Sequence, residues 1–396
     1  MKKTLFLLCL MASSFLLNSC SDEPEASAHS YTEQKAYEDV KKNCKDDEEH
    51  RFLRAGYEGD ESLLAVTDSS VKMLHAYMSG AAIGGHVSLV NRLIDKGVAP
   101  NSGLAGAVRC GHEELVMILV DKGAHRDFAL HLAAYYGHKK LIKHFLDAGV
   151  NPSYGLAGAA EAGNIKLVKQ MLEKGAEPSY GMFNAAIGGE REIVDLLLAA
   201  GALEHSEDAG SWLDAAVHGG HKELVLFFLE KGANPSMGIG EAARSGNKEL
   251  VDILLNAGAE PSPGLEGAAR VGDMELVNLF LEKGAEPSYG LKGAAMGGHR
   301  ELIALMLEKG GDPTSGLEGA AVLGDINIVK ELLDKGANPS AGMGNAVLNG
   351  HTEIVKLLLE NNADPTEGLW GASAQGYTEI VKLLRVGIIS HQAASV

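Results

Sequence analysis

Histidine is the residue type in this chain that most suggests chemistry, because fifteen are present and imidazole is a common metal ligand. Six of them recur at one position of a 26-residue pattern: His86, His112, His138, His221, His299 and His351. Equivalent residues of neighbouring repeats lie a helix-packing distance apart, about 10 Å, whereas the ligands of one metal ion each lie about 2.1 Å from it. We therefore predict no metal site, and we predict that these histidines cap the helix that follows each of them.

Catalytic motifs of known spacing are absent from the sequence. It contains no HExxH, no CxxC pair, no GxSxG nucleophile elbow and no GxxxxGK[ST] phosphate loop. The segment that precedes the repeats, residues 36–76, is too small for an ordinary catalytic domain. We expect a protein without enzymatic activity and without a cofactor.

The charge balance is strongly acidic. Lys and Arg number 35 against 53 Asp and Glu, which gives a net charge of −18. Because neutralising phosphates is the main source of affinity for nucleic acid, we expect no nucleic-acid partner. The 49 glycines, beside only 5% aromatic residues, indicate a fold that needs small side chains.

The first twenty residues read as an export signal. A basic start precedes an apolar run from Leu5 to Leu17, which is too short to span a bilayer as a mature helix. The ending LNSC at Cys20 resembles the lipobox of bacterial lipoproteins, in which signal peptidase II cuts before a cysteine that carries diacylglycerol. The resemblance implies a mature chain that begins at the lipidated Cys20 and is held by two or three acyl chains. An ordinary cleaved signal with a chance cysteine is the alternative.

The residues around the cleavage point also predict the cellular location of the protein. Ser21, rather than Asp, follows Cys20, which in a Gram-negative cell favours the periplasmic face of the outer membrane; secretion is the alternative.

Two cysteines, Cys44 and Cys110, remain in the mature chain. An exported compartment permits a disulfide between them, but Cys44 precedes the repeats and Cys110 lies in the second repeat, so we predict free, buried thiols.

From Tyr77 onward the sequence repeats with a period of 26 residues. The segment that starts at Gly155, GLAGAAEAGNIKLVKQMLEKGAEPSY, has close copies that start at Gly264 and Gly290. Twelve units follow one another to the C-terminus, and one step, within residues 181–212, is five residues longer than the others. Such an array indicates stacked repeats of one small structural unit.

Each unit is predicted to form two short helices, at 153–162 and 165–174 in the unit that starts at Gly155. Asn151 or Ser153 is the expected N-cap of the first helix, and Gly163 and Gly175 are expected to end the two helices. Glycine inside the first helix costs about 1 kcal/mol relative to alanine at each place. A cost that recurs in most units indicates that neighbouring first helices approach each other closely.

Composition divides the chain into four segments: a signal peptide at 1–19, a flexible polar tether at 20–35, a helical N-terminal cap at 36–76 and the repeat array at 77–396. Within the third segment, Tyr37, Val40 and Cys44 recur at helical spacing among charges, which predicts an amphipathic helix. Terminal units of stacked arrays need a polar outer side, and we assign that role to this segment.

The segments LHLAAYYGHKKLIKHFLDAGVNP and GHTEIVKLLLENNADP closely resemble the ankyrin repeat. The resemblance extends, with variation, from about Tyr77 to the end. Ankyrin units have about 33 residues, and the missing residues are those that would carry the β-hairpin. We therefore predict an all-α fold, an α-solenoid of about twelve stacked ankyrin-like helix-turn-helix repeats that lack most of the β-hairpins. The resemblance implies a solenoid that recognises proteins.

The two residues that follow the Ala-Ala pair of each first helix, here called the post-alanine positions, line the concave binding face of ankyrin proteins. The resemblance implies the same role in this chain, and the candidate anchors in the middle of the array are Tyr135, Tyr136, His218, Arg244, Arg270 and Met296. Packing between repeats explains apolar residues at these positions about equally well. Glu241 and Glu266 precede Arg244 and Arg270 by one helical turn, so intrahelical ion pairs are an alternative to binding a partner's carboxylate.

Together these patterns predict a non-enzymatic scaffold for protein–protein interaction, lipid-anchored in the bacterial cell envelope, that binds a protein or peptide on its concave face. Two other functions stay open. One is a host-directed ankyrin effector, although the lipoprotein leader argues against it. The other is a structural or protective envelope protein without a specific ligand. The expected partners are a protein or peptide and, through the N-terminal lipid, a membrane.

Overall fold

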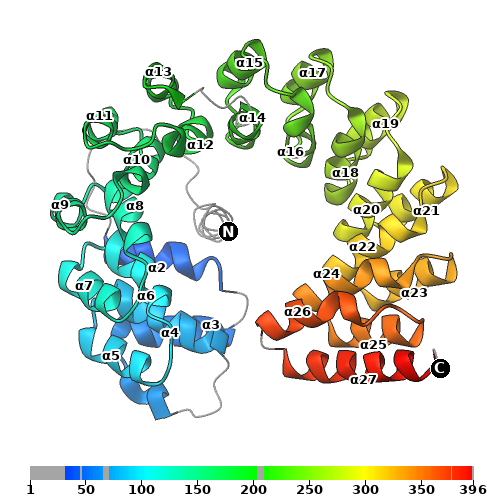
Figure 1. Cartoon of the computed structure of the whole chain (residues 1–396), viewed down its shortest axis with the longest axis horizontal. Helices are drawn as coiled ribbons and strands as arrows, with labels where there is room; N and C mark the ends of the chain where they lie inside the picture. Colours follow the sequence, from blue (N-terminus) through cyan, green and yellow to red (C-terminus); the bar gives the residue numbers. More distant parts are fainter. Residues whose placement is uncertain (1–31, 45–46, 66–70, 203–208, 376, 395–396) are drawn as a thin grey trace. The chain divides into compact units, whose positions relative to one another are not determined.

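A computed structural model describes residues 32–44, 47–65, 71–202, 209–375 and 377–394. The chain forms two compact units, Met1–His205 and Ser206–Val396, and each unit is a stack of helix pairs (Figure 1). Every element of the described residues is helical and none is a strand. The predicted all-α fold without β-hairpins is confirmed. The predicted signal peptide at 1–19, Cys20 and the tether as far as residue 31 lie outside the described residues.

Unit 1 begins with three elements that precede the predicted array and continues with five helix pairs. Its elements are α2 Glu33–Lys41, α3 Asp47–Glu58, the 3₁₀ helix η1 Glu61–Ala65, α4 Val71–Ile83, α5 Val87–Asp95, α6 Asn101–Arg109, α7 Glu113–Asp121, α8 Arg126–Tyr136, α9 Lys139–Asp147, α10 Pro152–Glu161, α11 Ile165–Glu173, α12 Ser179–Ile187 and α13 Arg191–Ala199.

Unit 2 contains the remaining seven helix pairs, and in two of them a short 3₁₀ helix opens the first helix. Its elements are α14 Ala209–His218, α15 Lys222–Glu230, η4 Pro235–Met237, α16 Ile239–Arg244, α17 Lys248–Asn256, α18 Pro261–Val271, α19 Met274–Glu282, α20 Pro287–Gly297, α21 Arg300–Glu308, α22 Pro313–Leu323, α23 Ile326–Asp334, η5 Pro339–Gly342, α24 Met343–Leu348, α25 Thr352–Glu360, α26 Thr366–Gln375 and α27 Thr378–Ala394.

Local sequence signals determine where each helix begins and ends. In the repeat that starts at Gly155, the predicted helices at 153–162 and 165–174 are α10 and α11, displaced by no more than one residue. The side chain of Asn151 caps α10 by accepting a hydrogen bond from the amide of Ser153, and Pro152 occupies the first turn. Gly163 and Gly175 have φ angles of 64° and 84°, the left-handed conformation that only glycine adopts at low cost.

The core of each unit lies between a layer of first helices and a layer of second helices (Figure 1). In α11 the apolar stripe Leu167, Val168 and Met171 is buried, and in α10 Leu156 and Ala160 have no exposed surface. Helices of nine residues are marginal in water by themselves. Burial of this stripe, about 1.5–3 kcal/mol for each large side chain, is what holds the second helices in place.

Neighbouring first helices approach until their backbones touch at glycine. A Cβ atom added to Gly158 would lie 2.0 Å from the carbonyl oxygen of His131, and one added to Gly293 would lie 2.2 Å from that of Glu266. No side chain fits at such distances. The close approach predicted from the repeated glycines is therefore confirmed, and it explains why a residue that weakens helices recurs inside them.

Hydroxyl groups join each repeat to the next along the N-terminal ends of the first helices. The hydroxyl of Ser153 accepts a hydrogen bond from the amide of Glu177, 24 residues later, at 2.8 Å. The same pair recurs from Ser236, Ser262, Ser288, Thr314 and Ser340 to the amides of Glu260, Glu286, Asp312, Asn338 and Asp364. Ser153, one of two predicted caps of α10, thus bonds to the following repeat, while Asn151 is the cap.

The recurring histidines have a different role from the predicted one. His86, His112, His299 and His351 stand at the N-cap positions of α5, α7, α21 and α25, but their side chains make no capping hydrogen bond. Each ring instead donates from Nε2 to a carbonyl oxygen 29 residues earlier, at the end of the preceding first helix, over 2.8–3.2 Å. Asn164 and Asp273, at the same position of other repeats, do cap their own helices.

Stacking starts before Tyr77, the residue at which we predicted the array to begin. Gly56 of α3 lies against the backbone of α4, since a Cβ added there would be 2.2 Å from the carbonyl oxygen of Tyr77. Gly80 of α4 faces the carbonyl oxygen of Leu53 in the same way, at 2.1 Å. Helix α3 is therefore stacked on α4 as one first helix is stacked on the next, and η1 follows it in place of a second helix.

We predict that Gly293→Ala destabilises the protein by about 1–3 kcal/mol, because the new methyl group forces two helix backbones apart. The measurement is urea denaturation followed by circular dichroism. Gly344→Ala is the matched control, since nothing lies within 4 Å of a Cβ added there, and its unfolding midpoint should stay the same or rise slightly. Equal losses of stability in both variants would contradict the packing described for Gly293.

Candidate functional site

The post-alanine positions at the start of unit 1 are covered by helix α2. Ala36 and Tyr37 of α2 form a buried cluster with Leu53 of α3 and Ile83 of α4. Partly buried apolar residues pack against this cluster, namely Val40, Cys44, Tyr57, Ala76 and Cys110. The spacing of Tyr37, Val40 and Cys44 predicted one amphipathic helix, from about Thr32 to Arg54. The structure instead has two helices there, α2 and α3, with Cys44 after the end of α2, and the apolar side of α2 lies on the first-helix layer.

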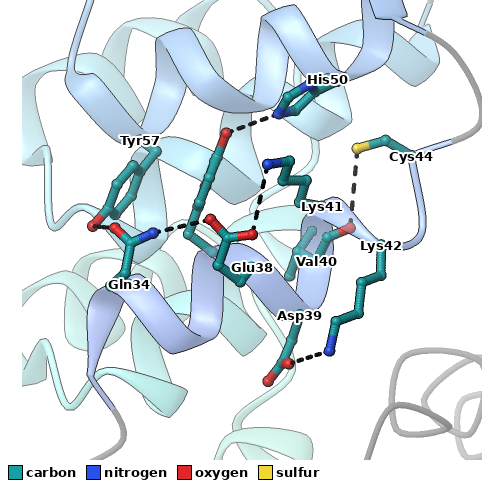
Figure 2. A network of polar contacts seen from close by, with 10 residues as sticks. Gln34, Glu38, Asp39, Val40, Lys41, Lys42, Cys44, His50 and Tyr57 are labelled. Carbon is teal, nitrogen blue, oxygen red and sulfur yellow. Dashed lines mark hydrogen bonds and ion pairs between the residues drawn. The ribbon is translucent and has the colours of Figure 1, made fainter.

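Polar contacts close the edges of this interface, as Figure 2 shows. The Tyr57 hydroxyl donates to Oε1 of Gln34 at 3.3 Å, and Nε2 of Gln34 donates to Glu38 at 3.0 Å (Figure 2). The rings of Tyr37 and Tyr57 are stacked with their centroids 4.6 Å apart, and a hydrogen bond of 3.0 Å joins the Tyr37 hydroxyl to His50. Helix α2 is therefore held by its apolar side and by a hydrogen-bonded rim.

A buried ion pair anchors α2 to the second predicted repeat. Asp39 and Arg109 are 6% and 8% exposed, and Nη1 of Arg109 lies 3.8 Å from Oδ2 of Asp39. The Nε of Arg109 donates to the Tyr136 hydroxyl at 2.9 Å. Since a charge is rarely buried without a partner, Asp39 and Tyr136 together make the buried arginine tolerable.

Tyr135 and Tyr136, the two predicted site residues of unit 1, end α8 side by side. Their rings meet edge to face with centroids 4.9 Å apart, and both side chains are half-buried. Because Tyr136 also receives the hydrogen bond from Arg109, its hydroxyl already has a structural partner. Contacts within the array explain the presence of Tyr136. Tyr135, whose ring is partly exposed, stays a predicted anchor for a partner.

In unit 2, Glu241 brings together two of the predicted site residues, His218 and Arg244. Nδ1 of His218 lies 3.1 Å from Oε1 of Glu241, and Arg244 donates to both carboxylate oxygens, at 2.6 and 2.8 Å. The intrahelical ion pair weighed for Arg244 is therefore present. Arg270 makes no ion pair with Glu266 or with any other described residue, and its side chain is exposed.

The charges of this cluster shift one another's titration. The hydrogen bond from His218, followed by that from Arg244, lowers the pKa of Glu241 to about 2 against the opposing effect of burial. The hydrogen bond to Glu241 raises the pKa of His218. Burial raises the pKa of the neighbouring Asp214, and the negative charge of Glu241 adds to that effect. The His218–Glu241 contact is thus strongest where both groups are charged, at mildly acidic pH.

Met296, the last predicted site residue, is half-buried at the end of α20. Its side chain reaches the next first helix, where a Cβ added to Gly319 would lie 3.1 Å from Met296 Cγ. The structure thus places His218, Arg244, Arg270 and Met296 at the same position of consecutive first helices in unit 2, but only His218 and Arg244 share a direct partner.

The three-copy model of ankyrin repeats matches residues 78–154, 156–238 and 317–391, more than half of the chain. The chain belongs to the ankyrin-repeat family. Ankyrin repeats are protein–protein interaction modules, so the match assigns a recognition domain to this protein at that general level. No curated protein matches the chain.

This ankyrin-repeat protein shows no preformed metal centre in the part of the chain that the structure describes, where no three His, Cys, Asp or Glu side chains are grouped so that they could hold an ion. Within the same residues, no helix combines the length and the apolar character that crossing a membrane requires. Cys44 and Cys110 form no disulfide in the described residues, as predicted, but both thiols are only partly buried rather than buried. Burial raises the pKa of Cys110 to about 12.

Asp39 and Arg109, the two residues whose ion pair holds α2 on this ankyrin array, were not identified from the sequence. Arg109 occupies a post-alanine position, but its sequence neighbours give no sign that it is buried. Asp39 falls among the charges of α2 and is one residue from Val40, which lies on the apolar side. The signal that was present is the amphipathic pattern of α2, whose apolar side required a surface to cover.

We predict that Glu241→Gln lowers the pKa of His218 from its raised value, because the neutral amide no longer stabilises the imidazolium. The NMR titration of the His218 ring measures this. The stability that the pair contributes is present below the ordinary histidine pKa, about 6.5, and is lost as the pH rises through the raised value. Glu249→Gln, which removes the partner of Lys222 instead, should leave the titration unchanged. An unaltered His218 pKa in Glu241→Gln would show that the contact does not exist in solution.

Proposed function

We propose that this ankyrin-repeat protein is a non-enzymatic recognition scaffold, lipid-anchored in the bacterial cell envelope, that binds a protein or peptide along its post-alanine positions. One observation carries the recognition part. The repeats keep their glycines, alanines and core leucines, whereas the post-alanine residues of unit 2 differ from repeat to repeat, from His218 and Arg270 to Met296 and Leu348. The fold does not require any of these particular side chains, because the glycines, alanines and leucines form the core of each repeat without them.

Exposed side chains at these positions support a recognition surface. Arg270 is exposed without an ion pair among the described residues, and Leu348 is 53% exposed. Aromatic residues, arginine and methionine are the types that anchor protein interfaces most often. A purely structural spacer would need only solvated residues here.

The anchoring part of the proposal comes from the leader and Cys20. Two or three acyl chains on one cysteine would hold the protein stably at a membrane. The predicted tether, residues 20–35, would link the lipid to the array, except that its last residues already belong to α2, which begins at Glu33. The proposed location of the protein is the cell envelope, on the periplasmic face of the outer membrane in a Gram-negative cell.

We predict that Cys20 carries the lipid. Metabolic labelling with a palmitate analogue should mark the wild-type chain and leave Cys20→Ala unlabelled, because acylation requires the cysteine sulfur. Cys44→Ala is the control for a thiol elsewhere in the chain, and it should be labelled like the wild type. Equal labelling of Cys20→Ala and wild type would rule out the anchor.

We predict that a partner captured from envelope extracts by residues 21–396 is lost when Tyr135, His218, Arg270 and Met296 are all changed to alanine. The expected thermal midpoint stays close to that of the wild type, because none of these side chains fills the core. Quantitative capture and differential scanning calorimetry give the two readings.

The matched control changes four exposed residues of second helices to alanine, namely Lys169, Leu226, Glu282 and Glu308. It should retain the partner. Loss of the partner from both variants, or retention by both, would contradict recognition at the post-alanine positions. A large fall in the midpoint of the first variant would identify these residues as packing residues.

A further inference from the structure

Four consecutive first helices of unit 2 carry a line of apolar side chains at the post-alanine positions. This α18–α24 stripe consists of Val271, Met296, Leu323 and Leu348. Val271 is 46% exposed, Leu323 41% and Leu348 53%, and Met296 is half-buried. Large apolar side chains that stand exposed in a row, rather than singly, are typical of a surface that meets a partner.

Three members of the stripe, Met296, Leu323 and Leu348, approach the helices next to their own. The Cγ of Met296 lies 3.1 Å from a Cβ added at Gly319 of α22, and Leu323 reaches back to within 3.3 Å of one added at Gly298. Leu348 reaches forward to within 3.5 Å of one added at Gly371 in α26. Met296, Leu323 and Leu348 thus each approach a neighbouring first-helix segment, and Val271 occupies a post-alanine position on α18.

Unit 1 shows what such a strip accepts in this fold. There the equivalent positions of α3, α4 and α6, occupied by Tyr57, Ile83 and Cys110, are covered by one short amphipathic helix, α2. The helix presents Ala36, Tyr37 and Val40 to the first-helix layer. The occupant of a post-alanine strip is thus seen directly, and it belongs to this chain.

Charge gives the second argument, because both strips have an arginine at the first of the two post-alanine positions. In unit 1, Arg109 faces Asp39 of the covering helix at 3.8 Å. In unit 2, Arg270 sits directly before Val271, is exposed and has no ion-pair partner among the described residues. The guanidinium of Arg270 is therefore available to bind a carboxylate of a partner.

We propose that the α18–α24 stripe binds a short amphipathic helix of the partner protein, with small and aromatic residues on its apolar side and a carboxylate that pairs with Arg270. The inference rests on the proposed recognition function and names the kind of partner. It goes beyond a general protein-binding face, because it specifies the four apolar contacts, the charge that the ligand carries and its helical form.

The probe is a fluorescein-labelled peptide with the sequence of residues 32–44, in which Cys44 is replaced by serine, titrated into the chain 21–396 and followed by fluorescence anisotropy. Binding to the wild-type chain is expected. Arg270→Glu should weaken it about tenfold or more, and a peptide with Asp39→Arg should regain affinity for Arg270→Glu while binding the wild type poorly. This reciprocal exchange of charges locates the peptide at Arg270.

Two variant pairs separate the stripe from other effects. Val271→Ser together with Leu348→Ser should abolish binding with an unchanged thermal midpoint, whereas Leu226→Ser, an exposed apolar residue on α15, should not. Lys283→Glu makes the same charge change as Arg270→Glu at an exposed residue after α19 and should leave the affinity unchanged.

Three outcomes would overturn the inference. Binding that is abolished by Arg109→Glu but not by Arg270→Glu would show that the peptide exchanges with α2 in unit 1. Self-association of the chain that Arg270→Glu abolishes would assign the stripe to a second copy. Absence of peptide binding would reject the helical, acidic ligand, while the envelope capture experiment would still decide separately whether the face recognises a protein at all.

Discussion

Backbone contact between neighbouring first helices is the constraint on which the rest of this structure depends. At Gly158, Gly267 and Gly293 a Cβ atom would lie 2.0–2.2 Å from a carbonyl oxygen of the preceding first helix. This distance fixes the spacing of the repeats. At that spacing a serine hydroxyl reaches the amide of the next repeat and an imidazole reaches the carbonyl of the previous one. It also lets post-alanine side chains of successive first helices meet, as Arg109 and Tyr136 do.

Features that depend on a few neighbouring residues were predictable from the sequence. The helix pairs follow from the apolar spacing in each 26-residue unit, and the ends of α10 and α11 follow from Asn151, Pro152 and two glycines. The close approach of the first helices followed from the cost of repeated glycines. The role of the histidines did not, because the N-cap position is local whereas the carbonyl that His86 reaches is 29 residues away.

The candidate site was predictable in position but not in partners. The Ala-Ala pairs locate the post-alanine positions, and Glu241 was foreseeable as a partner of Arg244 because both lie on one turn. The burial of Arg109 was not, since it results from α2, which approaches from outside the array. The two units also differ in whether the arginine at a post-alanine position has an ion-pair partner. In unit 1 the arginine is paired with Asp39 of the chain itself. Since a buried ion pair adds little net stability, Asp39 determines the position of α2 on the array more than the free energy of its docking. In unit 2 the corresponding arginine points to solvent.

The hydroxyl bonds between repeats bear on how such an array changes its length. Each serine or threonine accepts from an amide 24 residues later. Three of the residues that provide this amide, Asp312, Asn338 and Asp364, also cap the first helix that follows with their own side chains. Donor and acceptor therefore belong to different repeats of the same design. If one whole repeat is duplicated or lost, every hydroxyl still meets an equivalent amide, whereas a gain or loss of a few residues leaves both groups without partners. Recombination between repeats is thus structurally neutral in steps of one unit, and the recognition face can be lengthened or reordered without redesign of the scaffold.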